Sequence, residues 1–215
     1  MKRSTILRSG AVAFGALVLA SAGTATAFAD ATDYGSGDVD VNVDVTSTDT
    51  GTLALTVAAD STNLSEVTSS DVAYREFTGT LPEVTVTDTR SSDSIESGAY
   101  WYVLGSASDF TGTTDSSNTI SSTYLGWSPS LVTDDGEATV TPGDDVSSVA
   151  DDSSSTGLQD QELLSLTLDS AAAVDSDLAG VYTATAGLDL KIPATTTADT
   201  YTSVITLSLF EDIAG

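Results

Sequence analysis

Residues 84–90 read Val-Thr-Val-Thr-Asp-Thr-Arg, and their alternation is the pattern from which the fold of this chain is predicted. Side chains two residues apart on a β-strand point to the same face, so Val84 and Val86 predict a strand with one buried side. Threonine between them favours the same conformation. Asp88 and Arg90 are also two apart and face one side. An ion pair, or an arginine fork onto backbone carbonyls, would then fix the loop that follows.

The same two-residue period recurs along the rest of the chain. It is clearest over residues 38–45, where four valines alternate with Asp38, Asp40, Asn42 and Asp44. Further sets share one face: Leu53, Leu55 and Val57; Trp101 and Val103; Leu164, Leu166 and Leu168; Ile205, Leu207 and Leu209. Polar turn signals separate these runs, and only residues 171–173 suggest a short helical turn. Many short strands with frequent turns predict an all-β fold, an antiparallel β-sandwich or barrel in a single domain.

The N-terminal residues predict export. Three basic residues precede an apolar run over 11–22, and small residues flank two cleavage positions, after Ala27 or after Ala29. This is the pattern of a secretory signal peptide, residues 1–29, leaving a β domain over 30–215. The alternative is that the run stays attached as a membrane anchor. No later apolar segment reaches about 18 residues, so we expect no membrane span in the mature chain.

The charge of the mature chain is strongly negative. All 32 acidic residues lie at or after Asp30, against Arg75, Arg90 and Lys191, which gives a net charge of −29. Such a field repels nucleic acid and anionic lipid headgroups, so nucleic acid is excluded as a partner. Cysteine is absent, so the exported domain must be held together by core packing, without disulfides.

Five segments, taken in order, resemble the signature of the WxL domain, a β-rich module of Gram-positive cell surfaces. They are Asp88-Thr89-Arg90, Trp101 through Ser108-Asp109-Phe110, Ile192-Pro193-Ala194, Thr200-Tyr201-Thr202 and the strand that ends in Leu207-Ser208-Leu209. The resemblance covers roughly Gly51 to Phe210. The sequence departs from it at both Trp-x-Leu positions, because Tyr102 and Val103 follow Trp101 and because Leu207 stands where the second tryptophan would be.

The resemblance implies a secreted protein bound noncovalently to the cell wall, with peptidoglycan or a wall polymer as ligand and other surface proteins as further partners. It also implies that Asp88, Arg90, Asp109, Phe110, Tyr201, Leu207 and Leu209 are motif positions. Trp101, Tyr102 and Trp127 are the candidate ligand-binding residues, because an exposed aromatic face stacks on sugars. The alternative is that both tryptophans fill the core. Alternation with Val103 favours burial of Trp101, whereas Trp127 is expected in a turn beside Gly126 and Pro129. Arg90 could instead hold an anionic wall polymer.

Catalysis has little support in the residue types present. A serine nucleophile needs a base, and the chain has neither histidine nor cysteine. Lys191, the one lysine after residue 29, is expected on a strand between Leu190 and Ile192. Among 32 acids some pair lies at a suitable separation by chance, so paired carboxylates indicate nothing alone. We therefore predict a protein that is not an enzyme and has no cofactor.

Three acidic pairs raise the question of calcium: Asp134-Asp135, Asp144-Asp145 and Asp151-Asp152. Calcium needs six to eight converging oxygens, and no loop of the Asp-x-Asp-x-Asp-Gly type with a distal glutamate is present. Solvated surface charge is the favoured interpretation, and no metal site is predicted.

Two functions follow from these observations. The first is a noncatalytic cell-surface protein associated with the wall. The alternative is a structural subunit of an extracellular fibre or matrix, assembled when a segment such as Asp38–Val45 pairs with a neighbouring molecule. The acidic outer face of that segment opposes unregulated stacking unless cations screen it.

Overall fold

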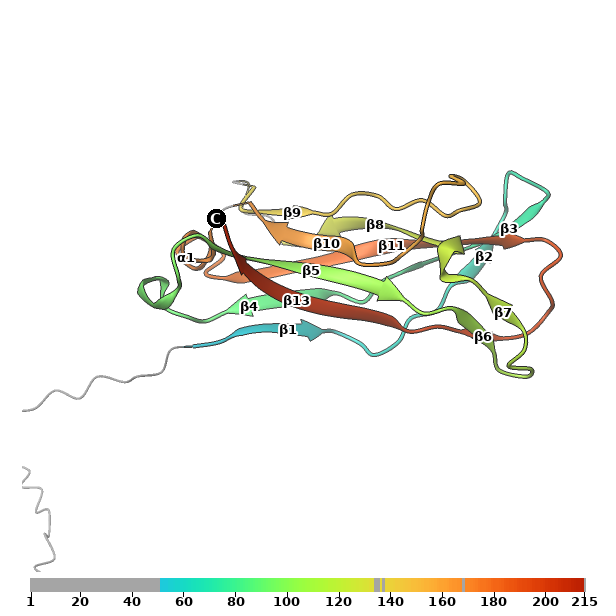
Figure 1. Ribbon diagram of the computed structural model, residues 1–215, viewed down its shortest axis with the longest axis horizontal. Helices are drawn as coiled ribbons and strands as arrows, with labels where there is room; N and C mark the ends of the chain where they lie inside the picture. Colours follow the sequence, from blue (N-terminus) through green and yellow to red (C-terminus); the bar gives the residue numbers. More distant parts are fainter. Residues whose placement is uncertain (1–50, 134–135, 137, 168, 215) are drawn as a thin grey trace, which may run out of the picture. The chain divides into compact units, whose positions relative to one another are not determined.

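The structure is a computed structural model that describes residues 51–133, 136, 138–167 and 169–214. The predicted signal peptide and the alternating segment Asp38–Val45 lie outside the described residues, as does Leu168. The described residues form thirteen strands in three sheets in which all pairs are antiparallel, and this confirms the predicted all-β, sandwich-like fold (Figure 1). No helix among them is long and apolar enough to span a bilayer.

The elements have the following bounds. The strands are β1 (Leu53–Val57), β2 (Ser65–Val67), β3 (Tyr74–Thr80), β4 (Val84–Asp88), β5 (Ala99–Ala107), β6 (Phe110–Gly112), β7 (Thr119–Ile120), β8 (Leu125–Leu131), β9 (Val140–Pro142), β10 (Gln161–Leu166), β11 (Val181–Pro193), β12 (Tyr201–Thr202) and β13 (Ile205–Ile213). The helical turns are η1 (Ser92–Ser94), η2 (Ser122–Tyr124) and α1 (Ser170–Val174).

The first sheet is built around the long strand β11. Strands β3 and β4 lie end to end along β11, and β2 and β1 pair with their outer sides, while β8 pairs with β11 separately. Pro82 lies in the break between β3 and β4, where a residue without an N–H group interrupts the ladder. One edge of this sheet is therefore formed by β1 and then by β2.

The second sheet has the order β13-β5-β10-β9, and a small third sheet, β12-β6-β7, continues it. Strand β6 follows β5 closely and β12 precedes β13 closely, and the Ser108 N–H donates to the Val204 carbonyl at 2.9 Å between the two pairs. One edge of these two sheets is therefore formed by β12 and then by β13. Figure 1 shows β13 running beside β1 along one side of the molecule.

The core lies between the two larger sheets, and the predicted inward positions fill it. Val84 and Val86 on β4 and Trp101 and Val103 on β5 are all 0% exposed. The Trp101 ring packs on that of Tyr182 from β11, with centroids 5.7 Å apart. The two-residue alternation therefore assigned the inner faces of the central strands correctly.

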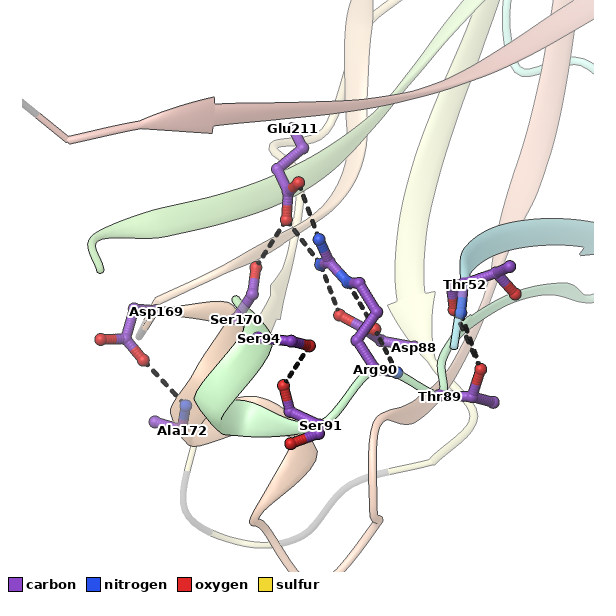
Figure 2. A network of polar contacts seen from close by, with 10 residues as sticks. All are labelled: Thr52, Asp88, Thr89, Arg90, Ser91, Ser94, Asp169, Ser170, Ala172 and Glu211. Carbon is purple, nitrogen blue, oxygen red and sulfur yellow. Dashed lines mark hydrogen bonds and ion pairs between the residues drawn. The ribbon is translucent and has the colours of Figure 1, made fainter. Parts of the chain in front are cut away.

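Two local predictions had different outcomes. The expected helical turn at 171–173 is present as α1, and the carboxylate of Asp169 caps it by accepting a hydrogen bond from Ala172 N–H at 2.8 Å (Figure 2). The expected turn at Trp127 is wrong, because Trp127 lies within β8 and pairs with Leu188 of β11. Glycine occupies position 126 of this strand because the Val146 backbone approaches too closely for a Cβ atom.

Gly105 on β5 leaves room for the buried Trp127 indole, and this generates a stability prediction. A Cβ atom at Gly105 would lie 2.6 Å from Cη2 of Trp127, whereas a Cβ atom at Gly187 would meet nothing within 4 Å. We expect Gly105→Ala to lower the free energy of unfolding by about 1–3 kcal/mol through overpacking. Gly187→Ala, the matched control, should leave it unchanged or raise it by about 0.5 kcal/mol. Urea denaturation measures both, and equal stabilities would show that the indole can move aside.

Candidate functional site

The candidate site lies between the edge strands of the two sheets. Strands β1 and β2 form one side and strands β12 and β13 form the other, and we call this boundary the seam. Among the described strands, β1 pairs only with β4, and β13 pairs only with β5. The other edge of each strand therefore faces the seam without a strand partner in the described part of the chain.

Burial falls from the centre of each sheet toward this seam. Val84 and Val86 on β4 are fully buried, but the inward residues of β1 are only half-buried or, at Val57, 42% exposed. The same holds in the other sheet, where Trp101 and Val103 are fully buried while the inward residues of β13, such as Leu207, are half-buried. Two rows of inward-facing apolar side chains thus lack complete cover.

An open groove of about 830 Å³ lies in this seam. Its walls include Leu55 and Val57 of β1, Leu64 before β2, Phe77 of β3 and Leu207 of β13. Its floor reaches the core at residues such as Leu190. The groove therefore has apolar side chains beside the free edges of β1 and β13, and polar loop residues such as Asn63 and Thr197 complete its lining.

The connector between β11 and β12 forms one end of the groove and is held by a carboxylate. Asp199 accepts hydrogen bonds from the N–H groups of Thr114 and Asp115 at 3.1 Å each, and from its neighbour Thr200 at 2.7 Å. Desolvation alone would raise the pKa of Asp199, but hydrogen bonds from Thr114, Asp115 and Asn118 outweigh it and hold the pKa far below the ordinary value of 3.8. In the same connector, the Tyr201 hydroxyl donates to the Thr197 carbonyl at 2.7 Å.

The seam is clamped at the opposite end by Arg90. Its guanidinium donates to both carboxylate oxygens of Asp88, at 2.8 and 2.7 Å, and to both of Glu211, at 3.0 and 2.6 Å (Figure 2). Asp88 belongs to β4 in the first sheet and Glu211 to β13 in the second. The ion pair predicted for Asp88 and Arg90 is therefore present, and it extends to a second acid that joins the two sheets. Hydrogen bonding to Asp88, then to Glu211, raises the pKa of Arg90.

Each basic side chain that the structure describes is paired with an acid. Arg75, at the groove, donates to Glu66 and lies 5.2 Å above the Phe77 ring, and its hydrogen bond lowers the pKa of Glu66. Lys191 lies on β11 as predicted and contacts Asp151. None of the three presents an unpaired cation to an anionic polymer, so the structure favours the structural role for Arg90.

The two tryptophans lie in the core. Trp101 is 0% exposed and Trp127 is 1% exposed, so neither offers a ring face on which a sugar could stack. The expectation of glycan contact by these residues is thereby corrected to the alternative that both fill the core. Both tryptophans occupy inward positions: Trp101 lies on β5 between β13 and β10, and Trp127 lies on β8 between its pairing with β11 and its bridge to Val146.

Tyr102 has a different environment, on the outer face of β5. Its ring stacks with Tyr100, at 6.1 Å between centroids, and with Phe210 on β13, at 5.5 Å. Phe210 is 45% exposed. We call Tyr100, Tyr102 and Phe210 the aromatic strip. Cross-strand aromatic pairs stabilise a sheet by themselves, so the strip has a structural use as well as an open face.

The other motif positions have structural surroundings. Asp109 accepts a hydrogen bond from Ser122 N–H at 2.8 Å, and Phe110 is buried. Leu209 and Leu207 face inward on β13, and Leu207 and Tyr201 also line the groove. Leu64 and Phe77 were missed by the sequence analysis, because neither belongs to a long alternating run. Within the described ranges, no group of three or more acidic side chains converges to hold a metal ion.

Comparisons with known proteins leave the family of this chain open. No family model matches the sequence, and no curated protein matches it. A chain from a structure of the chaperone–tip adhesin complex of CFA/I fimbriae biogenesis is similar with a TM-score of 0.43 and 11% identity, over 75% of this chain and 43% of that one. A family 123 glycoside hydrolase from Clostridium perfringens is similar with a TM-score of 0.30 and 14% identity, over 63% of this chain and 18% of the enzyme. This chain thus spans less than half of either, and similarity at this level assigns no function.

The clamp at Arg90 generates a stability prediction. The Asp88 side chain is 1% exposed, so Arg90→Leu would leave a buried carboxylate without its partner, and we expect a loss of about 3–5 kcal/mol in the free energy of unfolding. Arg75→Leu is the matched control, since the side chains of its pair with Glu66 are 40% and 48% exposed. The control should lose far less, as exposed pairs contribute little. Thermal and urea unfolding measure both, and similar losses would contradict the clamp.

Proposed function

We propose that this chain is a secreted, noncatalytic structural subunit of an extracellular fibre or matrix, whose subunits join by β-strand pairing at the seam. The observation that carries the proposal is the pair of inward apolar rows on β1 and β13 that stay half-exposed over an open groove. An edge strand offers unpaired N–H and C=O groups to another chain. A strand added at such an edge gains main-chain hydrogen bonds while its alternate side chains fill the groove.

The charge of the chain makes this assembly conditional. A mature net charge of −29 repels neighbouring subunits, so close approach needs cations in the medium to screen it. Salts that are excluded from protein surfaces also strengthen apolar burial. Assembly is therefore expected to increase with ionic strength.

Sedimentation of the mature chain tests the proposal. The wild-type protein should grow in size with concentration and with added salt. Val57→Glu places a charge in the groove at a side chain that is already 42% exposed, so it should abolish growth without unfolding the domain. Thr56→Glu, the neighbouring position on the outer face of β1, is the matched control and should assemble normally. Circular dichroism checks that both variants are folded, and a folded Val57→Glu chain that grows like wild type would remove the seam from the proposal.

A second candidate function is noncovalent association with the Gram-positive cell wall. The WxL resemblance implies it, and the aromatic strip on β5 and β13, in which Phe210 is exposed and both tyrosines are half-buried, is the observation that favours it. Exposed rings bury large apolar area against sugar surfaces. Tyr102 is the member of the strip that the sequence had already singled out for ligand contact.

Cosedimentation with purified peptidoglycan tests this second function. We expect the mature chain to pellet with the walls and the Tyr102→Ser, Phe210→Ser double variant to remain in the supernatant. Val72→Ser removes a side chain that is 97% exposed and distant from the strip in the sequence, so it controls for general loss of apolar surface. Equal pelleting of the double variant and the wild type would exclude the strip as the contact.

A further inference from the structure

Resting on the function proposed above, we propose that the strand received by the groove is Asp38–Val45 of a second copy of this chain, with its valines facing inward. The fibre hypothesis gave this segment as an example of one that pairs with a neighbouring molecule, and the proposal adds the surface that receives it. It rests on the side-chain repeat of the segment and of the groove strands, on the charge of their outward faces and on the path of the chain into β1.

The two-residue side-chain repeat of the segment matches that of the strands beside the groove. Val39, Val41, Val43 and Val45 repeat every second residue, so on a strand they project from one face about 6.6 Å apart. Leu55 and Val57 of β1 and Ile205 and Leu207 of β13, which line the groove, have the same repeat. An inserted strand would therefore present its valines at the spacing of both rows.

The opposite face of the segment fits the rim of the groove. Asp38, Asp40, Asn42 and Asp44 would point to solvent, where their charge remains hydrated. The outward residues beside them would be Ala54 and Thr56 on β1 and Thr206 and Ser208 on β13, all uncharged. The charged groups of the lining are Asp60, Asp199 and Arg75; Arg75 is neutralised by Glu66, and Asp199 accepts hydrogen bonds from the N–H groups of Thr114 and Asp115.

The path of the chain favours a second copy over the chain's own groove. Thr89 N–H donates to the Thr52 carbonyl at 2.9 Å, and Gly51 packs directly on the backbone of Thr89. The chain thus enters β1 along β4, from the clamped end near Arg90, whereas the groove opens toward Phe77 and Tyr201 at the other end. Insertion into its own groove would require the chain to fold back beside β1, as the two strands of a hairpin do. Extension into the next copy needs no such reversal, and head-to-tail insertion of this kind repeats without closing, as a fibre requires.

The absence of cysteine permits a direct test by disulfide formation between two singly substituted chains. Mature chains carrying Leu207→Cys are mixed with mature chains carrying Val39→Cys, Val41→Cys or Val43→Cys and are oxidised. A heterodimer on a non-reducing gel can form only between copies, and we expect it at one or more of the valine positions. Asp40→Cys and Asn42→Cys are the matched controls, because they face away from the groove and should give background levels only.

A binding measurement complements the crosslinking. Val41→Ser with Val43→Ser should weaken self-association roughly 100-fold, since two buried apolar side chains are lost. Asp40→Ser with Asp44→Ser should not weaken it, and should strengthen it by lowering repulsion. These four positions lie outside the described residues, and circular dichroism checks that each variant is folded.

The outcomes separate this inference from the function on which it rests. Equal crosslinking at the valine and the polar positions overturns the assignment. So does a disulfide that forms only when both cysteines are placed in the same chain. If chains lacking residues 38–45 still grow in size, the fibre proposal stands and the assignment of the strand fails. If the heterodimer forms but wild-type chains never grow beyond small oligomers, the strand is correctly assigned and the fibre proposal fails.

Discussion

Each strand of this domain has one inner face, and the structure depends on covering those faces without help from disulfides. At the centre, β4 and β11 lie over β5 and β10, and Val86, Trp101 and Tyr182 are sealed between them. At the seam the two sheets end in β1 and β13, and no described strand bridges them. The inner faces there remain partly open to water, which is unfavourable for apolar side chains.

The Arg90 clamp determines where that opening lies. One guanidinium joins the end of β4 to Glu211 on β13, so the seam is tied at the end where Asp88 is buried. At the other end a connector held by Asp199 forms the boundary of the groove. Of the three basic residues that the structure describes, Arg90 is the one that joins the two sheets at the seam, and the groove lies beside Val57 and Leu207.

The sequence predicted the strands well, and the side-chain sites less well. Alternation placed Val84, Trp101 and Leu207 on inward faces, because the period of a strand is a local property. It could not tell which strands lie at an edge, so it did not reveal that Val57 and Leu207 line a groove. Trp127 was misplaced in a turn because glycine and proline neighbours were given more weight than the pairing with β11. The Asp88–Arg90 pair was predicted from its spacing, but Glu211, 121 residues away from Arg90, has no signal in the local sequence.

The sequence by itself determined the class of the protein: a cysteine-free, strongly acidic, strand-built chain without histidine. These properties depend on residue types and on spacing along the chain, so they can be read from it directly. Only the tertiary structure decided that the tryptophans are enclosed, that Tyr102 stacks on an outer face and that an apolar groove lies between β1 and β13. Burial is a property of what packs opposite a residue, and in an antiparallel sandwich that neighbour comes from a distant part of the chain.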